Sequence, residues 1–326
     1  MKPNTIRLAT RALAATLCTA TSLAFAQAYP TKPIRMIAPI PAGSIVDVTG
    51  RAIGQSLMPA LGQPVVVENR VGANGTLGME ACSKSPGDGY TICIPDGNIM
   101  TINPFAYTKI PYDPLEFVNI IHIGDLEQSI VVQSSMPVKN MKELIDLARA
   151  NPSKVTWGSG GAGSTMHLYM EWLHAKTGVR FNHIPYKGPQ ELVRAMAAGE
   201  VQATNLSTSS IAPLVKEGRL RMIAVVTGKT RSQYAGDTPS FAEQGFELDF
   251  RNWLLLNAPR GTPVEVARRW NIEVNKLLAD PTFVQKVMAS QAMTPGGGTP
   301  ADLDALLKAK LKVGQEMAKI ANLKYD

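Results

Sequence analysis

Short apolar runs alternate with amphipathic stretches along most of this chain, and this alternation is what most constrains its fold. Runs such as 34–40, 65–69 and 220–226 have the length and composition of buried strands. Between such runs, stretches such as 44–61 and 189–198 carry apolar residues at helical spacing. Because alternation of this kind is typical of α/β folds, we predict an α/β protein built on parallel sheets.

The predicted elements extend to the end of the chain. Further strands are predicted at 90–95, 119–124, 129–133, 154–157, 180–185 and 201–206. A polar connection at 228–240 precedes an extended run at 248–258. Further helices are predicted at 76–85, from Asn140 to Asn151, from Ser164 to Gly178, at 210–217, from Thr262 as N-cap with Pro263 at N1, and from Thr299-Pro300 after a loop at Gly296-Gly297-Gly298. A chain of 326 residues is too long for one small doubly wound sheet. We therefore expect two α/β lobes, with ligands bound at the carboxyl ends of their strands.

Residues 1–26 have the pattern of a secretory signal. Three basic residues precede a short apolar stretch, 13–25, and Ala24-Phe25-Ala26 matches a cleavage site. The apolar stretch is shorter than the roughly 20 residues that span a bilayer. Cleavage before Gln27 is therefore favoured over an uncleaved membrane anchor, and we expect an exported protein.

Export would place Cys82 and Cys93 in an oxidising compartment. The two residues are able to form a disulfide, but two buried thiols that act as small apolar side chains fit the sequence equally well. No His or Cys lies beside either residue at the spacing of metal ligands, so we predict no metal site there.

The charge pattern argues against a nucleic-acid partner. Without residues 1–26 the chain has 30 basic and 26 acidic residues, and its longest basic block is the pair Arg268-Arg269. Nucleic-acid binding needs a clustered basic stripe, and the sequence has none. The small positive excess is compatible with an anionic small molecule.

Small and polar residues follow four of the predicted strands, and at least the first three stretches run directly into a helix. Backbone N–H groups at the start of a helix attract anions, and small residues allow a ligand to approach the backbone closely. A carboxylate could be held there without an arginine, although any one such loop could also be a tight turn that binds nothing. The four stretches are 39–44, 71–76, 158–165 and 205–210.

Motifs for other chemistries are incomplete. Gly158, Gly160 and Gly163 form the pattern G-x-G-x-x-G of dinucleotide-binding proteins. The segment 179–184 contains no acidic residue that could hold a ribose, so we predict no nicotinamide cofactor. No other cofactor is predicted. No serine lies in the G-x-S-x-G pattern of hydrolases, so catalysis is not predicted. His167 and His174 are interpreted as packing or surface residues.

Ordered motifs run through residues 29–326, and in this order and spacing they resemble the periplasmic solute-binding receptors of tripartite tricarboxylate transporters, also called Bug receptors. The motifs include Tyr29-Pro-x-Lys-Pro-Ile-Arg, Val65-Val-Val-Glu-Asn-Arg70, Pro86-Gly-Asp-Gly-Tyr90-Thr, His183-Ile-Pro-Tyr-Lys-Gly188 and Ala258-Pro-Arg-Gly-Thr-Pro263. The resemblance implies a two-lobed periplasmic-binding-protein fold, type II like, with a hinge between the lobes. It leads us to expect 27–126 and 228–326 in the first lobe and 127–227 in the second.

The resemblance also implies a binding site between the lobes. In such receptors the loop after the first strand and a glycine-rich loop of the second lobe hold the ligand carboxylate. Carried over to this sequence, the first loop gives Ala42, Gly43, Ser44 and Asp47, and the second gives Gly160, Ala162, Gly163, Ser164 and Thr165. From the residues alone, Asp47 either interacts with the helix dipole or braces the loop, and the dipole role is slightly favoured.

Three further residues are candidates because the sequence departs from the pattern of these receptors around them. Asn205 and Thr208 replace a stretch that usually carries an acidic residue, which makes them candidates for specificity. Arg251 could pair with a distal carboxylate or form an exposed salt bridge. Ser44 stands where a second glycine is common.

The resemblance implies a receptor, expected to be monomeric, that delivers a mono- or dicarboxylate to membrane permease subunits. A receptor for a sensor kinase is the main alternative, and a periplasmic hydrolase is a weaker one. The sequence does not distinguish an aliphatic from an aromatic ligand.

Overall fold

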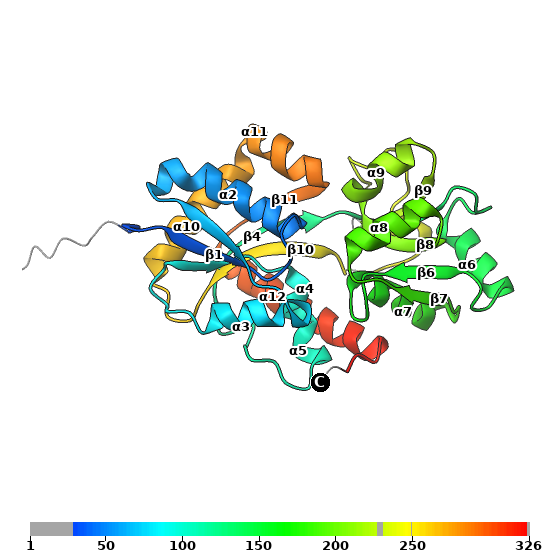
Figure 1. Ribbon diagram of the computed structural model, residues 1–326, viewed down its shortest axis with the longest axis horizontal. Helices are drawn as coiled ribbons and strands as arrows, with labels where there is room; N and C mark the ends of the chain where they lie inside the picture. The colour runs from blue at the N-terminus through cyan, green and yellow to red at the C-terminus, as the bar shows by residue number, and fades with distance from the viewer. Residues whose placement is uncertain (1–28, 227–230, 249, 325–326) are drawn as a thin grey trace, which may run out of the picture.

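The computed structural model describes residues 29–226, 231–248 and 250–324, and the expected signal sequence lies outside them. The described chain forms two lobes of mixed α/β structure, each built around its own sheet (Figure 1). The first sheet has the order β11-β4-β10-β3-β1-β2, and the second has the order β7-β6-β8-β5-β9.

The strands of the first sheet come from both ends of the chain: β1 (Ile34–Ala38), β2 (Val65–Asn69), β3 (Thr91–Cys93), β4 (Val118–Leu126), β10 (Asn252–Ala258) and β11 (Met293–Gly297). Those of the second sheet come from its middle: β5 (Gln128–Gln133), β6 (Thr156–Ser159), β7 (Asn182–Pro185), β8 (Ala203–Ser207) and β9 (Leu220–Val226). The chain therefore leaves the first lobe between β4 and β5 and returns to it before β10.

Helices cover the faces of both sheets (Figure 1). In the first lobe they are α2 (Ile45–Leu61), α3 (Thr76–Ser83), α4 (Gly97–Thr101), α5 (Asn103–Ala106), α10 (Val264–Ala279), α11 (Pro281–Phe283) and α12 (Pro300–Ile320). In the second lobe they are α6 (Met141–Ala150), α7 (Thr165–Thr177), α8 (Pro189–Ala198) and α9 (Thr208–Lys216).

The prediction of parallel sheets holds only in part, because each sheet is mixed. In the first sheet β1 runs parallel to β2 and β3, but β10 runs antiparallel to both β3 and β4. In the second sheet β6 runs parallel to β7 and β8, whereas β5 runs antiparallel to β8 and β9. The crossings between the lobes explain the difference: β4 leads out of the first lobe and β10 leads back into it, so these neighbours run in opposite directions.

Two local predictions also fail. Helix α10 starts after Pro263, and the Thr262 hydroxyl donates to the Pro259 carbonyl at 2.8 Å instead of capping the helix. Gly296 and Gly297 belong to strand β11 and not to a loop. A Cβ atom at Gly296 would lie 2.6 Å from Nδ1 of His122, so glycine is needed there because β11 packs closely against β4.

The last helix joins the hydrophobic cores of both lobes. At its start, Leu303 and Leu307 pack in a first-lobe cluster with Trp253. Near its end, Met317 and Ala318 pack in the main second-lobe cluster, which also holds Tyr169, Trp172, Phe241 and Phe250. Helix α12 therefore bridges the lobes, and its final turns lie against the second lobe although the segment 228–326 was expected in the first (Figure 1).

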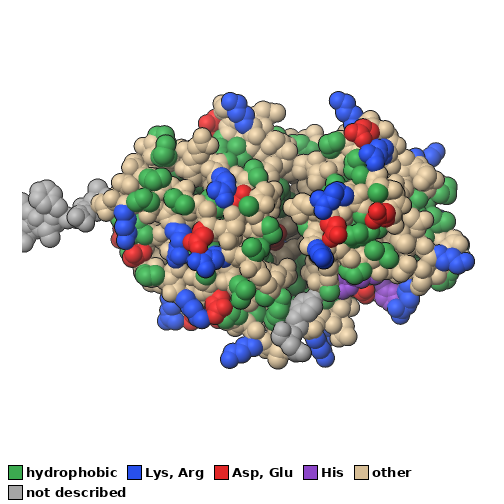
Figure 2. Space-filling model, viewed as in Figure 1, with side chains coloured by type: hydrophobic (Ala, Val, Ile, Leu, Met, Phe, Trp, Pro, Cys, Tyr) green, Lys and Arg blue, Asp and Glu red, His purple; other side chains and the backbone are tan. Residues whose placement is uncertain are grey.

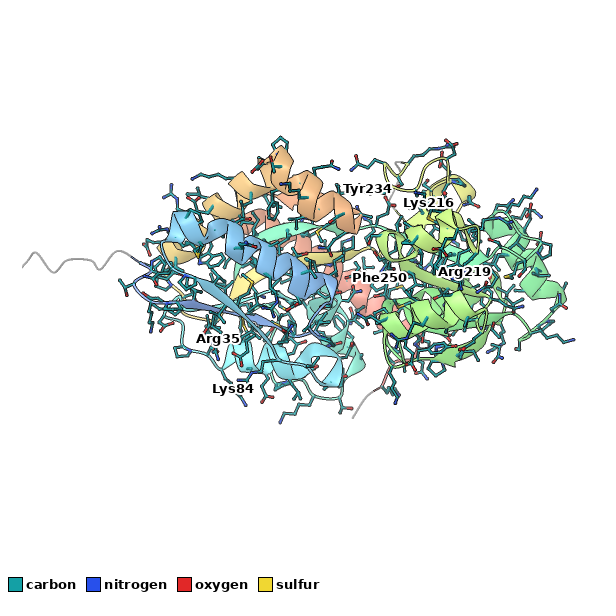
Figure 3. All side chains as sticks on the ribbon, turned by 45° about the horizontal axis from the view of Figure 1, so that its top comes forward. Arg35, Lys84, Lys216, Arg219, Tyr234 and Phe250 are labelled. Carbon is teal, nitrogen blue, oxygen red and sulfur yellow. A yellow bond between two sulfur atoms is a disulfide. The ribbon has the colours of Figure 1, made fainter. Side chains whose placement is uncertain are left out.

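The return segment makes further contacts at the junction. Tyr234 and Phe250 both lie where the lobes meet (Figure 3). The Tyr234 hydroxyl donates to the carbonyl of Met293 in β11 at 3.2 Å, and the Phe250 carbonyl accepts a hydrogen bond from Tyr169 of α7. The junction is thus built from backbone carbonyls and aromatic side chains of both lobes.

Cys82 and Cys93 form a disulfide, with their Cα atoms 6.3 Å apart. The bond connects α3 to β3, and both residues are fully buried. Of the two roles that the sequence allowed, the structure therefore shows the disulfide. Among the described residues, no helix is both long and apolar enough to cross a membrane.

Candidate functional site

A cleft separates the two lobes and is visible as a seam in the space-filling view (Figure 2). It holds two adjoining cavities of about 290 and 370 Å³ that share five lining residues. Each of the four small-residue stretches singled out in the sequence contributes to at least one cavity. The shared residues are Ile40, Asp96, Met166, Pro189 and Asn252.

The first-lobe loop leads from β1 into α2 through Gly43 and Ser44. Gly43 has a φ of +78°, a left-handed conformation that suits glycine. The Ser44 side chain caps α2 by accepting the N–H of Asp47 at 3.3 Å. In return, Oδ2 of Asp47 accepts the N–H of Gly43 at 3.0 Å, so Asp47 braces the loop, the role that was the less favoured of the two.

Asp47 is kept ionised by its neighbours. The residue is buried, and burial alone would raise the pKa of its carboxyl. Hydrogen bonds from Arg51 and from the Gly43 backbone outweigh that effect and lower the pKa below the usual value. The loop is therefore held by a charged acceptor across the neutral pH range.

The second-lobe loop repeats this geometry between β6 and α7. Gly163 has a φ of +75°, and the Ser164 side chain caps α7 by accepting the N–H of His167 at 3.4 Å. Nδ1 of His167 accepts the N–H of Gly163 at 3.1 Å, as Asp47 does for Gly43. The signal was present in the sequence but went unnoticed: both loops read Ala-Gly-Ser, followed by a hydrogen-bond acceptor three residues after the serine.

His167 is held in its neutral form. Its ring stacks on that of His183, with centroids 4.7 Å apart, and Nε2 of His183 lies 2.7 Å from the Ser159 hydroxyl. Burial, followed by the charge of His183, lowers the pKa of His167 to about 4. A neutral ring is what the contact to Gly163 requires, because only an unprotonated nitrogen accepts a hydrogen bond. His167 thus supports the candidate site in addition to packing.

The paired loops bring the starts of two helices to the cleft. The first N–H groups of a helix have no partner within the helix, and the helix dipole adds positive potential there. The residues that carry these groups in α2, Ile45 and Val46, line one cavity, and those in α7, Thr165 and Met166, line the other. The cleft therefore offers backbone donors from both lobes, and no basic side chain is among its described lining residues.

Four polar side chains that the sequence analysis missed also line the cleft. Asp96 caps α4 and follows the short strand β3, Asn98 lies within α4, and Asn252 begins β10. Gln128 lies at the start of β5 and is only 4% exposed. Nδ2 of Asn98 donates to Oγ1 of Thr165 at 2.9 Å, which is a direct contact between the lobes.

The residues predicted from the sequence separate into four groups. Gly43, Ser44, Gly160, Gly163, Ser164 and Thr165 line the cleft. Ala42 and Ala162 lie in the same loops but are exposed and line neither cavity. Asp47 lines neither cavity but holds the first loop through its hydrogen bond to the N–H of Gly43. Asn205, Thr208 and Arg251 also line neither cavity.

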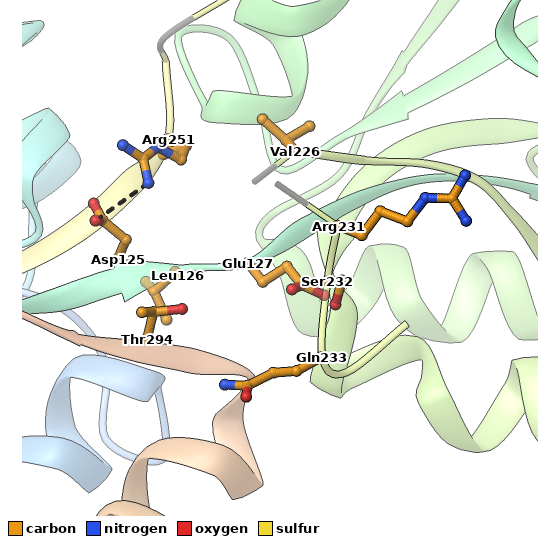
Figure 4. Close-up of a pocket in the computed structure, with 9 residues that line it drawn as sticks. All are labelled: Asp125, Leu126, Glu127, Val226, Arg231, Ser232, Gln233, Arg251 and Thr294. Carbon is orange, nitrogen blue, oxygen red and sulfur yellow. Dashed lines mark hydrogen bonds and ion pairs between the residues drawn. The ribbon is translucent and has the colours of Figure 1, made fainter. Parts of the chain in front are cut away.

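Those last three lie elsewhere. Asn205 is fully buried in β8. The Thr208 hydroxyl lies 2.8 Å from that of Ser129. Arg251 points into a separate cavity of about 270 Å³ at the junction of the lobes, where it forms a half-buried ion pair with Asp125 at 3.3 Å (Figure 4). The Arg251 cavity meets the larger cavity of the cleft at Leu126 and is otherwise lined by different residues.

Within the described ranges, no group of three or more His, Cys, Asp or Glu side chains is arranged to hold a metal ion. The arrangement in the cleft suits a small molecule with an anionic group.

Comparisons with known proteins agree over both lobes. A family model described as the tripartite tricarboxylate transporter family receptor matches residues 49–323. Protein BugT of Bordetella pertussis is 33% identical over 84% of this chain and 85% of its own. Among solved structures, R. palustris Rpa4515 with adipate is 31% identical with a TM-score of 0.82, and the periplasmic binding protein BugD is 29% identical with a TM-score of 0.78. Each of these two matches covers 91% of this chain and 100% of the other.

Proposed function

This chain belongs to the tripartite tricarboxylate transporter receptor family, and from that premise we propose that it captures a small carboxylate between its lobes and delivers it to membrane permease subunits. The adipate found with the related Rpa4515 supports a carboxylate ligand. In this proposal residues 1–26 export the chain to the periplasm, and its role is binding rather than catalysis.

The observation that carries the proposal is the matched pair of loops. Gly43-Ser44 and Gly163-Ser164 come from different lobes, have the same backbone conformation and precede helices of 17 and 13 residues. Each loop places backbone N–H groups at a cavity of the same cleft. A carboxylate that contacts both loops would hold the lobes together, so we propose that binding stabilises a closed form.

Thermal unfolding of residues 27–326 against aliphatic and aromatic mono-, di- and tricarboxylates tests this function. A ligand at 100 times its dissociation constant should stabilise the protein by about 2.7 kcal/mol, which gives a clear shift of the melting temperature. If no carboxylate in the panel shifts the melting temperature, the proposal is wrong.

A pair of variants tests the loop assignment. Gly163→Leu should reduce carboxylate affinity at least tenfold in calorimetry, because the side chain would enter the cleft and strain the backbone. Gly178→Leu is the matched control: Gly178 has a φ of +74° at the other end of α7, with open space around it. Equal affinities of the two variants would contradict the role of this loop.

A further inference from the structure

The cleft has an unusual charge composition for a site that would bind anions. Among the described residues that line its two cavities there is no Lys, Arg or His, and Asp96 is the only ionisable side chain. Asp96 lines both cavities and is 9% exposed. Away from the starts of α2 and α7, a second carboxylate on a ligand would therefore meet a negative side chain and, among the described lining residues, no positive one.

Each of the two cavities that Asp96 lines contains a further acceptor group. Because Nδ2 of Asn98 is used by Thr165, its Oδ1 remains, and this buried atom has no hydrogen-bond partner. Oε1 of Gln128, which lines the larger cavity together with Asp96, is also buried without a partner. Buried acceptors that have no partner are costly, and a ligand that donates hydrogen bonds removes that cost.

We infer that the ligand has two different ends: a carboxylate held by the Gly43-Ser44 and Gly163-Ser164 loops, and an ammonium or hydroxyl group held by Asp96, Asn98 and Gln128. The ligand class is thus a small amino- or hydroxycarboxylate, and not a di- or tricarboxylate. This inference rests on the proposed function and narrows it.

The chemistry of Asp96 supports the assignment. Burial raises the pKa of its carboxyl to about 6, while hydrogen bonds from the Asn98 backbone and the Asn252 side chain act in the opposite direction. Asp96 is therefore mainly ionised at pH 7.5. A buried carboxylate is stabilised by an ammonium group and destabilised by a second carboxylate.

The experiment measures calorimetric affinities at pH 7.5 for chain-length-matched acids of three to six carbons. Each length is represented by the unsubstituted monocarboxylate, the dicarboxylate, and the α-amino, ω-amino and ω-hydroxy monocarboxylates. We expect the best amino acid of the panel to bind at least tenfold more tightly than the dicarboxylate of the same length.

Variants then test whether Asp96 causes that preference. Asp96→Asn retains the size and helix-capping ability of the side chain and removes its charge. It should weaken binding of the amino acid at least tenfold and strengthen binding of the dicarboxylate. Gln128→Met removes a neutral acceptor at similar volume and should weaken amino acid binding several-fold.

Asp280→Asn provides the matched control. Asp280 also caps a helix, by accepting the N–H of Thr282 at 2.8 Å, and it does not line the cleft. It should leave all affinities unchanged.

The outcomes separate this inference from the proposed function. If dicarboxylates bind as tightly as the matched amino acids, or if Asp96→Asn leaves the ranking unchanged, the inference is wrong while the carboxylate receptor stands. If no acid in any series binds, both are wrong. A preference for amino acids that disappears in Asp96→Asn supports both.

Discussion

At the scale of single residues, Asp96 makes the stability of the empty protein depend on pH. Its pKa is about 6 in the folded protein against an ordinary value of 3.8, so folding favours the protonated form. The stability that this group contributes is fully present below pH 3.8 and is lost as the pH rises through 6. The loss amounts to about 3 kcal/mol, because one pKa unit corresponds to about 1.4 kcal/mol.

Urea unfolding of the ligand-free protein checks this prediction. Asp96→Asn should be more stable than the wild type at pH 8, by up to about 3 kcal/mol, and the difference should largely disappear at pH 4. Asp280→Asn should show no such gain. A constant difference between Asp96→Asn and the wild type at both pH values would show that Asp96 is not a source of pH dependence.

At the scale of elements, the two glycine–serine loops share one geometry but differ in the residue that braces them. Asp47 stays charged, whereas His167 must stay neutral to accept the N–H of Gly163. The pKa of His167 falls from the ordinary 6.5 to about 4, so the stability it contributes is present above pH 6.5 and is lost as the pH falls through 4. Acidification should therefore loosen the second-lobe loop and not the first.

The His167→Gln variant tests this asymmetry, because glutamine offers an acceptor that does not titrate. Between pH 7.5 and pH 4 the wild type should lose up to about 3 kcal/mol more unfolding free energy than the variant. Carboxylate affinity of the wild type should fall in the same range. If the two proteins lose stability in parallel, protonation of His167 does not control the loop.

Elements were predictable where their signals are local. Asn140 caps α6 by accepting the N–H of Glu143, and α12 starts after Thr299, as their sequence patterns indicated. The capping box of Thr299 with Asp302 was not predicted. The direction of β10 was not predictable, because an extended apolar run looks the same in either direction. It follows from the crossings between the lobes.

The site was predictable only where its residues carry a local sequence signal. The glycine and serine loops have a local signature, which brought six of the predicted residues to the cleft. Asp96 was missed because Pro95-Asp96-Gly97 resembles an ordinary turn, and β3 before it has only three residues. Its importance depends on Gln128 and Asn252, which line the same cavity although they lie far from it in the sequence.

At the scale of the whole molecule, α12 connects the lobes. It crosses α4 so closely that a Cβ atom at Gly314 would overlap the carbonyl oxygen of Thr101. Gly314→Ala should therefore destabilise the protein by about 1–3 kcal/mol, although the same change in an exposed helix stabilises it by up to about 1 kcal/mol. Thermal unfolding checks this, with the exposed neighbour Gln315→Ala as control. A Gly314→Ala protein as stable as the wild type would contradict the close packing.

A helix packed into both lobes also has a mechanical consequence. Helices curve gently, and sharp kinks need a proline, a bulge or an inserted group. Any rotation of one lobe against the other must therefore bend α12 or shift its packing contacts. Because α12 keeps its contacts with both lobes, we expect it to act as an elastic restraint on any movement that opens or closes the cleft.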